Sequence, residues 1–187
     1  EMEQTSRQKT KELGKTEGLR PEELDRLFKR LSLGALKYFL LKVEPTKRML
    51  FDPEESIDFR GDTGVFIQYG HARLCSILRK AADAGWTTEP TNSSTNILPT
   101  TEAIELLHEL HHFPEVLTDA AQAYDPARMA NHAYEVARAV GHFLYEVPVL
   151  RAPDDDTRQF RLALVEQARR SLEHSMRLLG IEVPEQM

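Results

Sequence analysis

The segment HELHH at residues 108–112 is the motif that most directly suggests chemistry, because it fits the H-E-x-x-H pattern of zinc-dependent hydrolases. On a helix, His108 and His112 lie on one face, four residues apart. A zinc site also needs a third ligand and an open coordination position, and Phe113-Pro114 should end the helix directly after the motif. Imidazoles in a last turn also complement the negative end of the helix dipole. We therefore expect a structural role for these histidines and no metal.

Other catalytic signatures are weak. Cys75 is the single cysteine, so it forms no internal disulfide, and its place inside a helix indicates a packing residue rather than a nucleophile. Neither a P-loop nor a G-x-G-x-x-G sequence occurs. The segment GDTG at residues 61–64 could cradle a phosphate only weakly, and Asp62 or Thr63 is better explained as the cap of the following helix.

One helical segment combines groups that suit RNA. Residues 68–73 (QYGHAR) bring an amide, a phenol, an imidazole and a guanidinium into one and a half turns. Tyr69 and Arg73, four residues apart, could offer a stacking plane and a fork for a phosphate or a base edge. His71 lies in the same segment. The alternative is a helix whose Tyr and Gln simply bridge core and solvent.

The elements that must position these residues are helical, because the apolar residues recur at a helical period and few Gly and Pro residues interrupt them. Residues 43–62 break the pattern and should be extended or looped, and the Thr-, Asn- and Pro-rich residues 87–100 are the best candidate for a surface loop. Gly34 marks either a kink or a point of close packing. We expect a mainly α fold, an antiparallel helical bundle, with helices from about Pro21 and over 65–84, 102–112, 127–145 and 158–179.

Composition narrows the class of protein. The chain has 187 residues, 41% hydrophobic and 29% charged, with a mean hydropathy of -0.47, as in ordinary soluble domains. No apolar run is long enough for a membrane span, and the polar start lacks the apolar segment of a signal peptide. With 24 basic and 30 acidic residues the formal charge is -6, so any nucleic acid must bind a local basic face. We expect a cytoplasmic monomer.

Six blocks, in order along the chain, resemble the arginyl-tRNA synthetase family, a class I aminoacyl-tRNA synthetase family. They are LGALKYFLLK (33–42), DFRGDTG (58–64), QYGHAR (68–73), HFPEV (112–116), NHAYEVA (131–137) and MRLLGIEVPEQM (176–187). The resemblance covers essentially the whole chain. It places a helix without a metal at residues 108–114, and it puts the short motif that names the DALR fold near DDTR at 155–158, where only Asp and Arg remain.

The resemblance implies a DALR-type anticodon-binding bundle over residues 63–187, preceded by a helical and irregular connector over residues 1–62 that contacts the tRNA stem. The HIGH and KMSK-type signatures of the family are absent from the sequence. The chain is therefore expected to be a fragment, inactive alone and without a cofactor. The full-length enzyme would be an arginine–tRNA ligase that uses ATP and Mg²⁺, with tRNA(Arg) as its partner.

The same resemblance implies three anticodon-loop contacts: Tyr69, Tyr145 and Met187, the last residue of the sequence. An aromatic ring or a polarizable thioether can stack on an unpaired base. We add His71 from the QYGHAR segment, and Arg73, Arg79 and Lys80 as phosphate contacts. The structural alternatives are that Tyr145 is a half-buried anchor, that Met187 is a frayed end and that the basic side chains are merely solvated.

Functions from other classes remain open. A freestanding helical RNA- or protein-interaction module would explain the bundle equally well and would bind a partner without a tRNA preference. A zinc hydrolase would hold stoichiometric metal. A related bundle from another class I synthetase, such as the one for cysteine, would prefer a different tRNA.

Overall fold

The helices of this protein begin where the sequence supplies caps. The computed structural model describes residue 7, residues 20–50, residue 52, residues 56–88 and residues 97–187. Thr63 caps α4 (Gly64–Asp83), Thr100 caps α5 (Thr101–His111), Asp125 caps α7 (Pro126–Glu146) and Asp154 caps α8 (Asp155–Leu178), each side chain accepting a backbone N–H in the first turn. α2 (Pro21–Leu41) begins with Pro at N1, as expected from the sequence.

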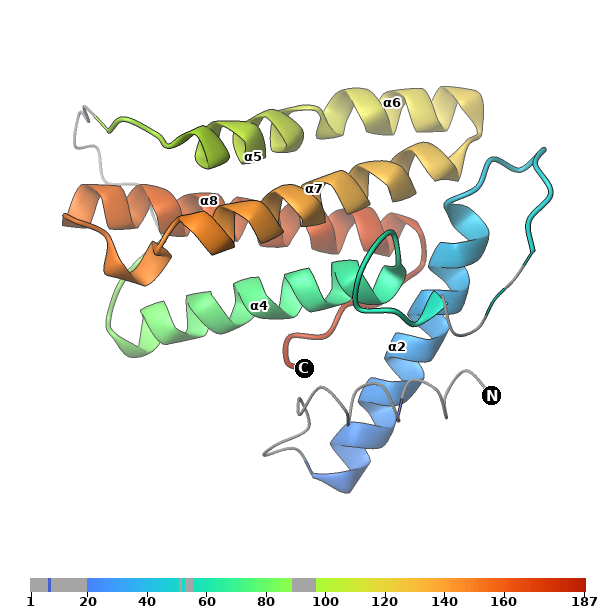
Figure 1. Ribbon diagram of the computed structural model, residues 1–187, viewed down its shortest axis with the longest axis horizontal. Helices are drawn as coiled ribbons and strands as arrows, with labels where there is room; N and C mark the ends of the chain where they lie inside the picture. Colours follow the sequence, from blue (N-terminus) through green and yellow to red (C-terminus); the bar gives the residue numbers. More distant parts are fainter. Residues whose placement is uncertain (1–6, 8–19, 51, 53–55, 89–96) are drawn as a thin grey trace.

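Three long helices, α4, α7 and α8, lie side by side and form the centre of the bundle (Figure 1). α5 and α6 (Phe113–Ala123) run end to end along the outer side of α7. Consecutive arms of this bundle run antiparallel, which confirms the expected architecture. A short 3-10 turn, η1 (Val149–Arg151), joins α7 to α8. The described residues contain no strand.

The main core fills the space between these helices. Its fully buried side chains come from α4, α5, α7 and α8 and include Leu74, Leu106, Val136, Phe143, Leu162 and Leu172, while α6 contributes only partly buried ones. Burying one such side chain contributes about 1.5–3 kcal/mol relative to leaving it exposed. The packed core therefore holds the helices, and the side chains on their outer faces, in fixed positions.

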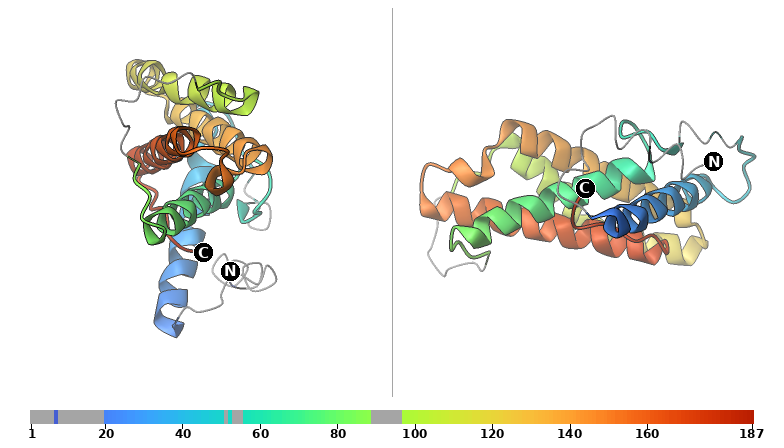
Figure 2. Two further views of the ribbon diagram at one scale, coloured as in Figure 1. Left: turned by 90° about the vertical axis from the view of Figure 1, so that its left-hand side faces the viewer. Right: turned by 90° about the horizontal axis from the view of Figure 1, so that it is seen from below.

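α2 crosses the bundle at a steep angle and packs on the first turns of α4 (Figures 1 and 2). Two glycines allow this close crossing. A Cβ built on Gly64 would lie 2.8 Å from Tyr38 Cβ, and one on Gly34 would lie 2.5 Å from Gln68 Nε2. Gly34 is therefore a point of close packing inside one continuous helix. A second apolar cluster, made by Leu27, Leu31, Ala35, Ile57 and Val65, lies beside the crossing.

Helix α6 was not expected from the sequence. The helix that carries the HELHH segment does end directly before Phe113-Pro114, as expected, but Pro114 also occupies the first turn of a new helix, α6. Pro terminates one helix and begins another equally well, because its missing N–H needs no partner in a first turn. The loop expected over residues 87–100 lies mostly outside the described residues. Residues 43–50 are irregular, as predicted.

Candidate nucleic-acid interface

The chain after α8 is an extended segment, residues 180–187, that turns at Gly180 and runs back along α4. Gly180 adopts φ +69°, the left-handed conformation that glycine tolerates at the end of a helix. Side chains of α4 hold the segment by its backbone carbonyls. Gln68 Nε2 donates to the Glu182 carbonyl at 2.7 Å, and Arg79 Nη2 donates to the Glu185 carbonyl at 3.3 Å.

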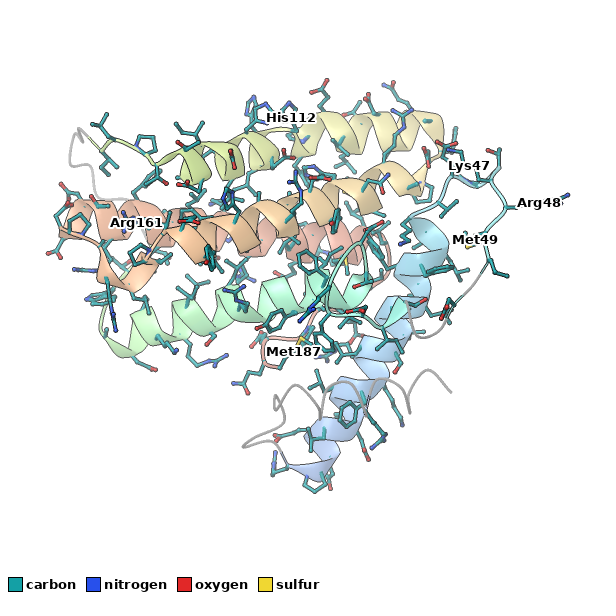
Figure 3. The ribbon with its side chains drawn as sticks, viewed as in Figure 1. Lys47, Arg48, Met49, His112, Arg161 and Met187 are labelled. Atoms are coloured by element: carbon teal, nitrogen blue, oxygen red, sulfur yellow. The ribbon has the colours of Figure 1, made fainter. Side chains whose placement is uncertain are left out.

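Met187 is held at the end of this segment. Its side chain, labelled in Figure 3, is half-buried and packs against the second apolar cluster. The Phe59 side chain packs against the same cluster. The Phe59 ring in turn meets the Tyr69 ring edge-on, with centroids 6.1 Å apart. The second apolar cluster therefore holds both Met187 and Phe59, and the Phe59 ring in turn contacts Tyr69. Phe59 was not among the expected site residues, since a single aromatic in an irregular segment gives no signal of its neighbours.

The Tyr69 ring also has a basic companion. The Arg73 guanidinium lies over it, 5.8 Å from its centroid, at a distance suited to a cation–π contact. Tyr69, Arg73 and Lys80 follow the i, i+4, i+11 spacing and so share one face of α4. This face lies about 100° around the helix axis from the face that carries Gln68, because successive helical residues are separated by about 100°. Lys80 is exposed near the end of the helix. This face can offer a ring and two positive charges to a nucleic acid.

Tyr145 lies elsewhere on the bundle, in the last turn of α7. Its side chain is 84% exposed, so it is a surface residue rather than a half-buried anchor. The C-terminal ends of α4 and α7 lie at the same end of the bundle (Figure 1). Tyr145 is therefore at the end that carries Arg79 and Lys80. Tyr69 lies about 17 Å from Lys80 along α4, from eleven residues of helical rise.

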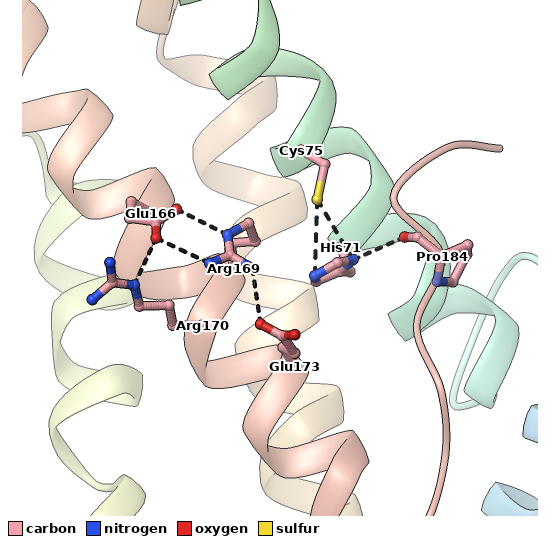
Figure 4. Close-up of polar contacts among 7 residues, drawn as sticks. All are labelled: His71, Cys75, Glu166, Arg169, Arg170, Glu173 and Pro184. Atoms are coloured by element: carbon pink, nitrogen blue, oxygen red, sulfur yellow. Dashed lines mark hydrogen bonds and ion pairs between the residues drawn. The ribbon is translucent and has the colours of Figure 1, made fainter. Parts of the chain in front are cut away.

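His71 does not fit its expected role as a direct RNA contact. The side chain is 2% exposed, and its Nδ1 lies 2.9 Å from the Pro184 carbonyl (Figure 4). A carbonyl oxygen only accepts, so Nδ1 is assigned the proton. Burial lowers the pKa of His71, and nearby Arg169 lowers it further, against the opposing effect of the Pro184 carbonyl. His71 thus contacts the C-terminal segment instead of solvent.

The thiol of Cys75 lies over the His71 ring, 3.7 Å from Nδ1 and 3.8 Å from Nε2. Burial raises the pKa of this thiol to about 11. A thiol that stays protonated near neutral pH is a poor nucleophile, so the interpretation of Cys75 as a packing residue holds.

Arg169 of α8 faces this region with its charge balanced by two carboxylates (Figure 4). It donates to both oxygens of Glu166, at 2.9 and 3.0 Å, and to Glu173 at 2.9 Å. The hydrogen bond to Glu166 raises the pKa of Arg169, and the same bond is the main cause of the lowered pKa of Glu166. The network is internal to α8 and leaves little net charge beside His71.

The HELHH segment has a structural explanation. His108 and His112 stack edge to face at 4.2 Å, and His112 Nδ1 lies 2.9 Å from the His108 carbonyl in the last turn of α5. Among the described residues, no group of three or more His, Cys, Asp or Glu side chains is placed to hold a metal ion. None of the helices in that part of the chain is long and apolar enough to cross a bilayer.

Comparison with known proteins decides the family. The DALR anticodon binding domain matches residues 67–187, well over half of the chain. The chain belongs to this family. The resemblance carried by the six sequence blocks and the expected DALR bundle are both confirmed.

Curated relatives of the DALR chain share one description. The arginine–tRNA ligase of Amoebophilus asiaticus is 42% identical over 187 residues, and that of Bacteroides fragilis is 41% identical over 187 residues. Each match covers 100% of this chain and 31% of the relative. The chain therefore spans about a third of the length of the curated proteins that it matches.

Solved structures agree with the fold of the DALR chain. Thermus thermophilus arginyl-tRNA synthetase superposes with a TM-score of 0.84 at 31% identity, covering 100% of this chain and 31% of that one. Plasmodium falciparum arginyl-tRNA synthetase gives a TM-score of 0.82 at 23% identity, covering 100% and 32%. At that lower identity the second likeness concerns the fold alone.

Proposed function

We propose that this chain is the anticodon-binding part of an arginine–tRNA ligase and that it recognises the anticodon loop of tRNA(Arg). The observation that carries the proposal is the match to arginine–tRNA ligases at about 40% identity over the entire chain, together with the DALR match. In this proposal residues 63–187 form the anticodon-binding bundle and residues 1–62 the connector that contacts the tRNA stem.

The proposed contacts combine stacking with charge. Tyr145 is exposed and can stack on an unpaired base. Tyr69 contacts Phe59, and Met187 packs on the same apolar cluster as Phe59, so the two can hold a second base. Arg73 and Lys80 share the Tyr69 face of α4 and can neutralise phosphates. Such a local basic face is what an RNA needs on a chain whose formal charge is -6.

Aminoacylation itself would belong to the whole enzyme, acting in the cytoplasm as a monomer. The residues described here do not fit ATP or Mg²⁺, since the sequence lacks the HIGH and KMSK-type signatures and no acidic cluster suited to a metal lies among the described residues. ATP and Mg²⁺ would therefore bind to the remaining two-thirds of the protein.

The test is a binding comparison between tRNA(Arg) and the same tRNA with its anticodon bases replaced, at two salt concentrations. We expect tighter binding of the native anticodon by the 187-residue chain. In the full-length enzyme, Tyr145→Ala should raise the KM for tRNA and leave the KM for ATP, which would bind outside this chain, unchanged. Equal affinity for both tRNAs together with an unchanged KM would contradict the proposal and favour a helical protein-interaction module.

A further inference from the structure

The C-terminal segment is held by a strip of donors on one face of α4. Gln68, His71 and Arg79 contact three carbonyls within four residues, those of Glu182, Pro184 and Glu185. The three side chains recur at the i, i+3, i+11 spacing, so they lie on one helix face. Lys37 of α2 adds a hydrogen bond to the Gly180 carbonyl. The strip matches the path of the segment along α4 (Figures 1 and 4).

Two members of this strip are polar groups that burial makes costly. Gln68 is 0% exposed and His71 is 2% exposed. A buried donor destabilises a fold unless it finds a partner, and Gln68 Nε2 and His71 Nδ1 each contact a backbone carbonyl of the C-terminal segment. The absence of a side chain at Gly34 makes room for the Gln68 amide, since a Cβ there would lie 2.5 Å from Nε2. The packing of α2 on α4 is thus adapted to this contact.

The strip holds the C-terminal segment up to Glu185, two residues before Met187. Met187 follows Pro184 by three residues, and its side chain packs on the second apolar cluster, against which Phe59, the ring that contacts Tyr69, also packs. Residues 182–187, all of them described, make no backbone–backbone hydrogen bond that would fix their path. The carbonyl contacts from α4 therefore fix the backbone path that leads to Met187, together with the apolar packing of Ile181, Val183 and Met187 itself.

We propose that Gln68 and His71 are positioning residues that fix Met187 beside Tyr69, so that thioether and phenol together form one nucleobase-binding surface. The inference rests on the proposed function for the identity of the ligand, an unpaired base of an RNA loop. It assigns the two buried residues no contact with RNA. Their effect on binding passes through Met187 alone.

The first experiment observes Met187 directly, without RNA. The chain has five methionines, so ¹³C-methyl methionine spectra can follow each one. We expect His71→Leu to move the Met187 methyl signal to its position in an unfolded chain, while the signals of Met129 and Met176, both buried in the main core, stay in place. His71→Asn, whose amide can donate from the position of Nδ1, should retain the native Met187 signal. An unchanged Met187 signal in folded His71→Leu would overturn the proposal.

Should His71→Leu fail to fold, as loss of the Met129 and Met176 signals would show, Gln68→Leu provides the same test. This substitution removes the donor to the Glu182 carbonyl and also removes Gln68 Oε1, a buried acceptor for which no hydrogen-bond partner is present among the described residues. We expect the Met187 signal to shift and the core signals to persist.

The second experiment is a double-mutant cycle on binding of the native and anticodon-substituted tRNA. Met187→Ala should weaken binding of the native tRNA about tenfold, as expected for the loss of one stacked base. His71→Leu should do the same, and the double variant should be no worse than either single one, since both changes remove one contact. Additive losses would overturn the positioning role. If Met187→Ala has no effect while Tyr145→Ala weakens binding, only this inference fails; if neither has an effect, the proposed function fails.

Discussion

At the scale of single residues, two exposed tyrosines differ in their distance from the basic end of α4, which is part of the proposed RNA interface. Tyr145 and Tyr124 are both tyrosines at helix ends, 84% and 89% exposed. Tyr145 ends α7 on the side of the bundle that carries Arg79 and Lys80, whereas Tyr124 ends α6 at the opposite end (Figure 1). The two residues form a matched pair for testing the proposed interface.

We expect Tyr145→Ala to weaken binding of tRNA(Arg) by about 1–3 kcal/mol, the range for one base stacked on an aromatic side chain. The free energy of unfolding should change by no more than about 0.5 kcal/mol, because an exposed ring makes few contacts. Titration of the tRNA and denaturant unfolding measure the two quantities. Tyr124→Ala is the control and should leave binding unchanged. Equal losses from both variants would argue against a specific contact at Tyr145.

The basic residues of α4 lead to a prediction about salt. Arg73→Gln and Lys80→Gln should each lower the slope of log affinity against log salt concentration by about 0.7, the value for one phosphate contact of a single strand. Arg138→Gln, on the α7 surface that faces α5, is the control and should keep the wild-type slope. Binding measured between low and moderate salt decides the point. A slope unaltered by neutralising Arg73 and Lys80 would show that they are only solvated.

At the scale of elements, glycine sets how closely α2 approaches α4. We expect Gly64→Ala to destabilise the fold by about 1–3 kcal/mol, because the new methyl would lie 2.8 Å from Tyr38 Cβ and 2.9 Å from the Gly34 carbonyl oxygen. Gly141→Ala, inside α7 with no atom within 4 Å of the new Cβ, should instead stabilise by about 0.5–1 kcal/mol. Denaturant unfolding of the two variants measures both changes in the free energy of unfolding, which should have opposite signs. A neutral Gly64→Ala would mean that the helices can separate freely.

At the scale of the whole molecule, buried histidines make stability depend on pH. His71 and His132 both have a pKa below the ordinary value of 6.5, chiefly because burial disfavours the charged imidazolium. The unfolded chain therefore binds more protons than the folded one as the pH drops below 6.5, and the free energy of unfolding falls there. Glu166, with its pKa held below the ordinary 4.5 by Arg169 and Arg170, adds a loss only at lower pH.

Denaturant unfolding between pH 7.5 and 5 measures this decline. His132→Leu should flatten it, because the variant has no imidazole to protonate at this buried position. His174→Gln, at an exposed histidine of α8, is the control and should leave the decline unchanged. The same decline in His132→Leu as in the wild type would assign the pH dependence to other groups.

The sequence by itself determined the helices and the family. Capping residues such as Thr63, Thr100 and Asp125 bond backbone N–H groups within three residues, so the helix starts can be predicted from local sequence. The apolar periodicity predicted the buried faces for the same reason. Pro114 shows the limit of local reasoning, since the start of α6 and the end of α5 carry the same residue signal.

Only the tertiary structure decided which residues of the proposed site belong together. His71 and Pro184 are 113 residues apart, and Gln68 and Glu182 are 114 apart, so no pattern in the sequence relates them. The QYGHAR segment indicated one polar face, whereas the fold divides it: Tyr69 and Arg73 face outward, and Gln68 and His71 turn inward to the C-terminal segment. The physical reason is that the packing partner of a helix determines which of its faces is buried. The partner of this face of α4 is the C-terminal segment, which lies more than 100 residues away in the sequence.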